Sequence, residues 1–256
     1  MGIVNLTPDS FSGDGLHHRT DAAFDQAMRM MAAGADLLDV GAESTRPGAQ
    51  PVTAQEELDR LLPLLARLQD AGVPVSVDTT KASVMAESIQ LGVGLVNDVT
   101  ALRDPDAAAV LAPHSEVAVC LMHMQGEPRS MQSAPQYDDV VRDVRVFLQQ
   151  AERNAVAAGI DRNRLLLDPG FGFGKTFAHN QQLFRALPEL TGLGLPLLVG
   201  VSRKTMIGHV LDKPVSDRVV GSVVAAVLAA QSGAAVLRVH DVAETIDALK
   251  IWDALG

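Results

Sequence analysis

The chain alternates between short apolar runs and longer segments with helical periodicity, and this alternation limits its fold more than any other feature. We predict strands at residues 3–6, 36–40, 74–77, 95–97, 117–122, 165–167, 196–201 and 236–239. A segment with helical character follows each of them, at residues 20–33, 53–70, 81–91, 105–111, 138–158, 180–187, 215–231 and 242–255. Short apolar strands separated by helices are typical of parallel strands buried on both faces.

Eight strand and helix units within 256 residues predict an α/β fold with one domain, a (β/α)8 TIM barrel that spans residues 1–256. An open, doubly wound sheet is the alternative. The longer irregular stretches are residues 7–19, 42–52 and 125–137, which we interpret as candidate lids or binding loops.

The net charge of −10 argues against nucleic acid or an anionic membrane as a partner, because an acidic surface repels phosphate groups. No apolar run is long enough to span a bilayer, and the first residues, MGIVNLTPDSF, lack the pattern of a signal peptide. Cys120 is the only cysteine, which excludes an internal disulfide. We therefore expect a cytoplasmic protein.

The sequence LLLDPGFGFGK, at residues 165–175, breaks local folding rules at the end of a predicted strand. Asp168 follows three leucines, and Pro169 and alternating glycine and phenylalanine come next. Such an ending indicates a functional site, although a tight turn made of glycines explains it as well. The tail resembles a phosphate-binding P-loop, but that motif requires glycine where Pro169 stands.

Polar side chains follow every predicted strand. They are Asn5 and Thr7; Asp39, Glu43, Ser44, Thr45 and Arg46; Asp78; Asn97 and Asp98; His123; Asp168; Ser202, Arg203 and Lys204; and Arg238 and His240. Barrel enzymes place their active sites at the carboxyl ends of the strands, so this pattern predicts a site there.

The polar residues fall into two chemical groups. Asp78, Asn97 and Asp168 offer hydrogen-bond acceptors, which suit a flat heterocycle rich in N–H groups. The cationic residues of the last two strand ends indicate an anion, since barrel enzymes often bind phosphate there. Asn5, a neutral oxygen donor near such a phosphate, would suit Mg²⁺.

Some of these residues have a purely structural explanation. Asp39 and Asp98 could equally well brace neighbouring strands, and His123 fits a wall residue better than a catalyst. We expect His17 and His18 to be solvated in a polar loop. The spacing of the histidines gives no case for zinc.

Eight motifs, in order along the chain, carry a resemblance to a known family. They are GIVNLTPDSFS (residues 2–12), ESTRPGA (43–49), SVDT (76–79), NDV (97–99), MHMQG (122–126), DPGFGFGK (168–175), SRK (202–204) and RVHD (238–241). Together they resemble the bacterial dihydropteroate synthases, which are pterin-binding TIM barrels, and the resemblance runs from residue 2 to the last predicted helix.

The resemblance implies an enzyme of folate biosynthesis that joins (7,8-dihydropterin-6-yl)methyl diphosphate to 4-aminobenzoate with Mg²⁺ as cofactor. It implies catalytic roles for Asp78, Asp168 and Lys204. The implied pterin residues are Asp78, Asn97, Met122, Asp168, Gly200 and Lys204; the diphosphate residues are Asn5, Thr45, Arg238 and His240, with Asn5 also at the metal; and the aminobenzoate residues are Thr45, Arg46, Pro47, Phe173 and Thr205.

The resemblance also implies how the reaction runs and how the chain assembles. Members of the family are thought to ionise the C–O bond first, which leaves a pterin-stabilised methylene cation that the arylamine attacks. A homodimer is expected, formed through the later helices, where residues 221–230 are rich in alanine and valine. Thr205 stands where serine is frequent in the family, which keeps the hydroxyl and adds a methyl group.

Two other functions compete with this interpretation. A methyltetrahydrofolate:corrinoid methyltransferase shares the Asp and Asn pterin slot, but it has no need of the TRPGA, SRK and RVHD motifs. A catalytically silent relative that only binds pterin would be expected to lose loop residues such as Asn5, Thr45 or Arg46, and all three are present.

Overall fold

The computed structural model describes residues 1–6, 16–44, 50–126 and 131–255. Six parallel strands follow one another in chain order in one sheet, and the last two strands pair with each other. The strands are β1 (Gly2–Asn5), β2 (Leu38–Gly41), β3 (Val75–Asp78), β4 (Leu95–Asp98), β5 (Ala118–Met122), β6 (Leu165–Asp168), β7 (Leu198–Val199) and β8 (Val236–Leu237). Every predicted strand is therefore present, each within a few residues of its predicted bounds.

Two isolated bridges close these strands into a ring. Val239, just after β8, pairs with Gly2 in β1, and its N–H donates to the Met1 carbonyl at 3.0 Å. Leu167 in β6 pairs with Leu197, just before β7. The strand order thus runs around a closed barrel, and the TIM barrel prediction is confirmed. The doubly wound alternative is wrong, because such a sheet is open and its strand order reverses at a switch point.

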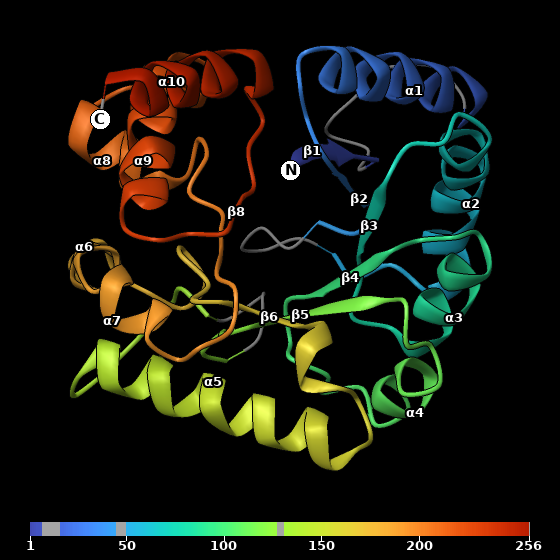
Figure 1. Ribbon diagram of the computed structural model, residues 1–256, viewed down its shortest axis with the longest axis horizontal. Helices are drawn as coiled ribbons and strands as arrows, with labels where there is room; N and C mark the ends of the chain where they lie inside the picture. Colours follow the sequence, from blue (N-terminus) through green and yellow to red (C-terminus); the bar gives the residue numbers. More distant parts are fainter. Residues whose placement is uncertain (7–15, 45–49, 127–130, 256) are drawn as a thin grey trace.

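The helices surround the strands in chain order (Figure 1). They are α1 (Leu16–Ala32), α2 (Ala54–Asp70), α3 (Ala82–Gln90), α4 (Ala107–Leu111), α5 (Val140–Ala157), α6 (Phe177–Arg185), α7 (Leu187–Thr191), α8 (Thr205–Leu211), α9 (Val219–Gln231) and α10 (Val242–Leu255), with 3₁₀ turns η1 (Arg162–Arg164) and η2 (Val215–Asp217). Among the described residues, no helix combines the length and the apolar character needed to cross a membrane.

Helix α2 illustrates how the sequence sets these elements. Thr53 and Glu56 form a capping box, in which each side chain satisfies a backbone N–H of the other residue. Leu61, Leu64 and Leu68 recur at helical spacing and are fully buried against the barrel. One hydrophobic cluster collects these leucines with apolar residues of the strands and of the other helices.

Three predicted helices differ from the observed ones. The predicted helix at residues 180–187 spans the break between α6 and α7. We predicted that His17 and His18 lie in a polar loop, and this is wrong. Helix α1 begins at Leu16, so both histidines lie in a helix. The predicted helix at residues 215–231 corresponds to α9, which begins later, at Val219. Helix α8, which precedes it, was not predicted. Helix α8 has seven residues, too few to reveal a helical period in the sequence.

Candidate active site

The predicted pterin residues lie in adjacent strands at the carboxyl end of the barrel. Asn5 pairs in register with Gly41, and Gly41 pairs with Asp78. Asp78 pairs in turn with Asn97, and further around the barrel Met122 pairs with Asp168. A Cβ atom at Gly41 would lie 3.2 Å from the Cβ of Asp78, so glycine leaves room for that carboxyl group.

Asp39 joins three of these strands through a buried network. Its side chain is fully buried, and it accepts hydrogen bonds from Ser76 Oγ at 2.6 Å and Asn97 Nδ2 at 3.2 Å. Arg238 Nε donates to the same carboxylate at 2.5 Å, and Arg238 Nη2 donates to Asp78 Oδ2 at 2.8 Å. Asp39 therefore braces the site and holds Arg238 over it.

Asn97 brings an unsatisfied acceptor to this network. Its side chain is 3% exposed, and its Oδ1 is one of three buried side-chain atoms among the described residues that have no hydrogen-bond partner. An orphaned buried acceptor costs about 1–3 kcal/mol. A ligand that brings an N–H group to Asn97 would recover that free energy.

Burial shifts the protonation of the charged groups at this end of the barrel. It raises the pKa of Asp78 to about 7, although the nearby Arg238 guanidinium acts in the opposite direction. Burial also raises the pKa of Asp168, against the Lys204 ammonium. The pKa of Lys204 is lowered to about 8, again mainly by burial. Perturbed groups of both signs in one place are typical of a functional site.

The loop after β6 has a conformation that requires glycine. Gly170, Gly172 and Gly174 have φ angles of 68°, 80° and 60°, and a side chain at Gly170 would collide with the carbonyl of His123. Asp168 Oδ1 accepts a hydrogen bond from the Gly170 N–H at 2.7 Å. The carboxylate of Asp168 thus stabilises the first turn of this loop.

Lys204, which follows β7, also contacts the loop after β6. It is the N-cap residue of α8, and its Nζ donates to the Phe171 carbonyl at 2.5 Å. The ammonium also lies 4.7 Å from the centre of the Phe173 ring, within the range of a cation–π contact. Thr205 begins α8 and is exposed.

Lys175 is turned into the protein. Its Nζ lies 2.9 Å from His123 Nδ1 and donates to the Gly170 and Phe173 carbonyls. His123 is 5% exposed and packs edge-on against Phe147, with ring centroids 4.8 Å apart. His123 is therefore a wall residue, as the sequence favoured.

The predicted anion residues divide into two groups. The backbone N–H of His240 donates to Ser202 Oγ at 3.1 Å, and the ring Nδ1 lies 3.0 Å from the same oxygen. Arg203, by contrast, forms an ion pair with Asp241, with Nε 3.0 Å from Oδ2. Gly200, after β7, lies against the Arg238 side chain, because a Cβ there would be 3.6 Å from the Cβ of Arg238. His240 and Arg238 remain candidates for binding the anion, whereas the guanidinium group of Arg203 is already paired with Asp241.

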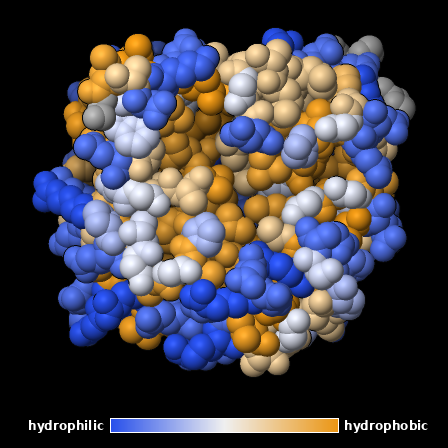
Figure 2. Space-filling view, in the orientation of Figure 1, coloured by the Kyte–Doolittle hydropathy of each residue, from blue (hydrophilic) through white to orange (hydrophobic). Residues whose placement is uncertain are grey.

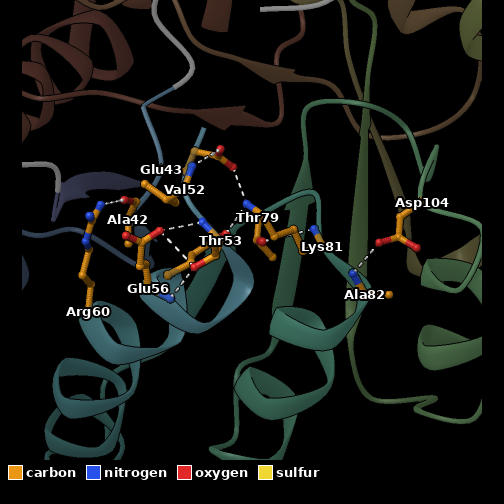
Figure 3. Close-up of polar contacts among 11 residues, drawn as sticks. Ala42, Glu43, Val52, Thr53, Glu56, Arg60, Thr79, Lys81, Ala82 and Asp104 are labelled. Carbon is orange, nitrogen blue, oxygen red and sulfur yellow. Dashed lines mark hydrogen bonds and ion pairs between the residues drawn. The ribbon is translucent and has the colours of Figure 1, made fainter. Parts of the chain in front are cut away.

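A partly buried ion cluster that we did not predict joins Glu43, just after β2, to Lys81 and Glu57; Glu43 and Lys81 are labelled in Figure 3. Lys81 Nζ lies 2.6 Å from both Glu43 Oε2 and Glu57 Oε2. Glu43 Oε1 also accepts from the Val52 N–H at 3.2 Å. The sequence signal was Glu57, a carboxylate on the apolar face of α2 one turn before Leu61. The predicted residues Thr45, Arg46 and Pro47 lie outside the described residues.

Comparisons with known proteins fit this geometry. A family model described as pterin binding enzyme matches residues 1–240. The dihydropteroate synthase of Haemophilus influenzae is 48% identical over 255 residues, which cover 99% of this chain and 92% of that protein. The chain belongs to the dihydropteroate synthase family.

Solved structures agree. A dihydropteroate synthase of Xanthomonas albilineans with 4-aminobenzoic acid has a TM-score of 0.94 and 51% identity, and the match covers 100% of this chain and 92% of that one. The same enzyme in complex with 7,8-dihydropteroate has a TM-score of 0.91 and 49% identity, with the same coverage. Full-length similarity to synthases sets the corrinoid methyltransferase interpretation aside.

Proposed function

We propose that this synthase joins (7,8-dihydropterin-6-yl)methyl diphosphate to 4-aminobenzoate at the carboxyl end of the barrel, which gives 7,8-dihydropteroate and diphosphate. The observation that carries the proposal is a set of acceptors at strand ends, Asp78 and Asn97 on the adjacent strands β3 and β4 and Asp168 on β6, with Asn97 Oδ1 buried and unpaired among the described residues. Such a set fits the N–H edge of a pterin.

The pterin is assigned to the slot between these acceptors and the loop after β7. Asp78, Asn97 and Asp168 would accept hydrogen bonds from the ring, and Lys204 would donate to it. Met122 is 2% exposed and packs with Val99, Met124 and Met131 in an apolar cluster. Met122 and Gly200 would form the flat walls of the slot.

The reaction is proposed to begin with cleavage of the C–O bond. The electron pair of that bond leaves with the diphosphate oxygen, and the carboxylates of Asp78 and Asp168 stabilise the methylene cation. The amine nitrogen of aminobenzoate then forms the new C–N bond and releases its proton to solvent or to the departing diphosphate. No protein nucleophile is required.

The diphosphate is assigned to Asn5, Thr45, Arg238 and His240. Strands β8 and β1 are neighbours, and Val239, just after β8, pairs with Gly2 at the start of β1. Arg238 uses Nε and Nη2 for Asp39 and Asp78, and its remaining N–H groups are available to phosphate oxygens. This arrangement holds the leaving group beside the breaking bond.

Mg²⁺ is proposed as the cofactor, with Asn5 as its protein ligand. No cluster of three His, Cys, Asp or Glu side chains within the described ranges could hold a metal. A neutral amide oxygen next to a diphosphate fits Mg²⁺, which retains water and relies on substrate phosphates. When bound, the ion would neutralise charge on the departing diphosphate.

Aminobenzoate is assigned to the mouth of the site, beside Thr45, Arg46, Pro47, Phe173 and Thr205. Phe173 is partly buried, and its ring lies under the Lys204 ammonium. The exposed Thr205 opens the next helix. These two residues would form one side of the aminobenzoate pocket, and Thr45, Arg46 and Pro47 lie outside the described residues.

A homodimer is proposed through helices α8 to α10. Val220, Val224 and Leu228 are 75%, 53% and 46% exposed and form one stripe along α9. Exposed apolar residues of α8 and α10 extend this patch: Val210, Leu211, Ile251, Trp252 and Leu255. Figure 2 shows some hydrophobic residues at this corner of the molecule, interspersed with hydrophilic ones. We expect Val224→Glu to convert a dimer to a monomer in sedimentation velocity.

Residues 1–256 are proposed to form one pterin-binding domain. This is supported by a hydrophobic cluster that includes both Val4 and Val242.

The cytoplasm is proposed as the site of action. This is supported by Cys120, which is the only cysteine and is fully buried.

The test is release of diphosphate from the pterin substrate with Mg²⁺, measured with and without 4-aminobenzoate and repeated for Lys204→Ala. We expect product formation that depends on aminobenzoate and collapses in the variant. Tight pterin binding without turnover in the wild type would instead identify a catalytically silent relative.

A further inference from the structure

The loop from Gly170 to Gly174 has to be held in place by other parts of the molecule. Glycine at alternate positions makes this segment conformationally free in the unfolded chain, and ordering it is entropically unfavourable. The loop nevertheless supplies two contacts to the site, the Phe171 carbonyl for Lys204 and the Phe173 ring. Small displacements of the loop would move both contacts.

Lys175 holds this loop from within the protein. It is 3% exposed, and its Nζ contacts the Gly170 carbonyl at 2.8 Å, the Phe173 carbonyl at 3.1 Å and His123 Nδ1 at 2.9 Å. An ammonium group has three protons, so all of them are used. Lys175 therefore ties the beginning and the middle of the loop to the end of β5, and has no proton left for a substrate.

His123 anchors the Lys175 side chain. To accept from the Lys175 ammonium, Nδ1 must be unprotonated, and burial together with the Lys175 charge lowers the pKa of His123 to about 2. The ring is held by Phe147 and lies 6.1 Å from the ring of Tyr137. Tyr137 donates its hydroxyl to the Gly174 carbonyl at 2.8 Å, which secures the end of the same loop.

We propose that Lys175, anchored on His123, is a positioning residue that holds the loop after β6 in the conformation that binds aminobenzoate. The inference rests on the proposed function, because it takes Phe173 as a wall of the aminobenzoate site. It predicts a larger effect on aminobenzoate than on the pterin. Lys175 directly fixes the Phe173 carbonyl, whereas Asp78 and Asn97 contact neither Lys175 nor this loop. The pterin residues Asp168 and Lys204 form hydrogen bonds with the loop only at Gly170 and Phe171.

A residue that only stabilised the fold would behave differently, and the chain offers a matched control. Arg164 lies just before β6, at the opposite end of the strand from Lys175, and it is also a buried cation that donates to backbone carbonyls. Its Nε and Nη2 donate to Val117 and Leu111 at 2.7 and 2.8 Å. Loss of Arg164 should destabilise the barrel without moving the loop.

The experiment measures kcat and KM for each substrate, together with urea unfolding, in four variants. Lys175→Met and His123→Leu should raise the KM for 4-aminobenzoate about tenfold and the KM for the pterin diphosphate less than about threefold. His123→Asn keeps an acceptor near the Nδ1 position and should restore most of the aminobenzoate KM. Arg164→Met should lower the urea midpoint and leave both KM values unchanged.

Two results would overturn the proposal. One is a wild-type aminobenzoate KM in Lys175→Met, and the other is an equal rise in Arg164→Met. If Lys175→Met does not fold, the comparison of His123→Leu with His123→Asn decides the question, because both variants retain the lysine. A wild-type enzyme without aminobenzoate-dependent turnover would refute the proposed function instead, so the two failures are distinguishable.

Discussion

Two lysines donate to carbonyls of the same glycine-rich loop, and their hydrogen-bond donors are satisfied to very different degrees. Lys175 is buried and has three partners, two of them carbonyls of the loop. Lys204 is more exposed and has the Phe171 carbonyl and the face of Phe173. A buried cation whose donors are all used holds structure, whereas a cation with spare donors beside a carboxylate can bind a ligand.

Two aspartates of the site, Asp39 and Asp78, differ in the same way. Asp39 is fully buried and accepts from Ser76, Asn97 and Arg238, so its carboxylate is occupied. Among the described residues, Asp78 has one hydrogen-bond partner, Arg238, and its side chain is 13% exposed. Asp39, whose acceptors are occupied, is therefore structural, whereas Asp78 can still accept a hydrogen bond from a substrate.

The largest effect is expected for Lys204→Met. Removal of a donor and a charge beside Asp168 should lower kcat/KM for the pterin diphosphate by about 100-fold or more. The urea midpoint should change little, because the variant loses one carbonyl contact. Steady-state kinetics and urea unfolding of both lysine variants test this difference between Lys204 and Lys175. The difference would be refuted if Lys175→Met lowered kcat/KM for the pterin diphosphate as much as Lys204→Met.

The pH dependence of activity tests the role of Asp78. Burial raises its pKa to about 7, and in the proposed role the ionised form would accept the pterin N–H groups. In the free enzyme, kcat/KM should therefore fall as pH decreases below about 7, by up to tenfold per pH unit. Asp78→Asn should lower kcat/KM at all pH values and abolish this limb of the profile. An unchanged limb in the variant would assign the titration to another group.

The pH dependence of stability tests the burial of Lys175. Its pKa is lowered to about 7, mainly by burial, whereas an unfolded lysine titrates near 10.4. Between these values the unfolded state binds more protons, so the free energy of unfolding should rise with pH, at most by about 1.4 kcal/mol per unit. Urea unfolding at pH 8 and 10 should show this rise in the wild type and a smaller one in Lys175→Met. Equal slopes would mean that Lys175 titrates normally.

The sequence predicted the barrel because the fold depends on repeated local signals. Each buried strand is an apolar run, and each long helix carries its own period, as in α2 with Leu61, Leu64 and Leu68. The short helix α8 escaped prediction because seven residues hold no readable period. The early start of α1 escaped because its first turn, with His17 and His18, is polar.

The site was predictable to the extent that its residues end strands. Asp78, Asn97 and Asp168 could be grouped as candidates from the sequence, because the ends of parallel strands meet at one rim of the barrel. Which side chains pair with one another depends on distances across the barrel, and no local pattern contains them. The bonds of Arg238 to Asp39 and of Lys175 to His123 are of this kind.

The smallest effect is expected for Tyr137→Phe, which removes one tie of the loop and leaves the ammonium in place. The lost hydrogen bond to the Gly174 carbonyl should lower the free energy of unfolding by about 0.5–1.5 kcal/mol. The KM for 4-aminobenzoate should rise no more than about twofold, because Lys175 still fixes the Gly170 and Phe173 carbonyls. Urea unfolding and steady-state kinetics measure both quantities. A rise as large as that of Lys175→Met would show that the tyrosine hydroxyl, and not the lysine, sets the position of Phe173.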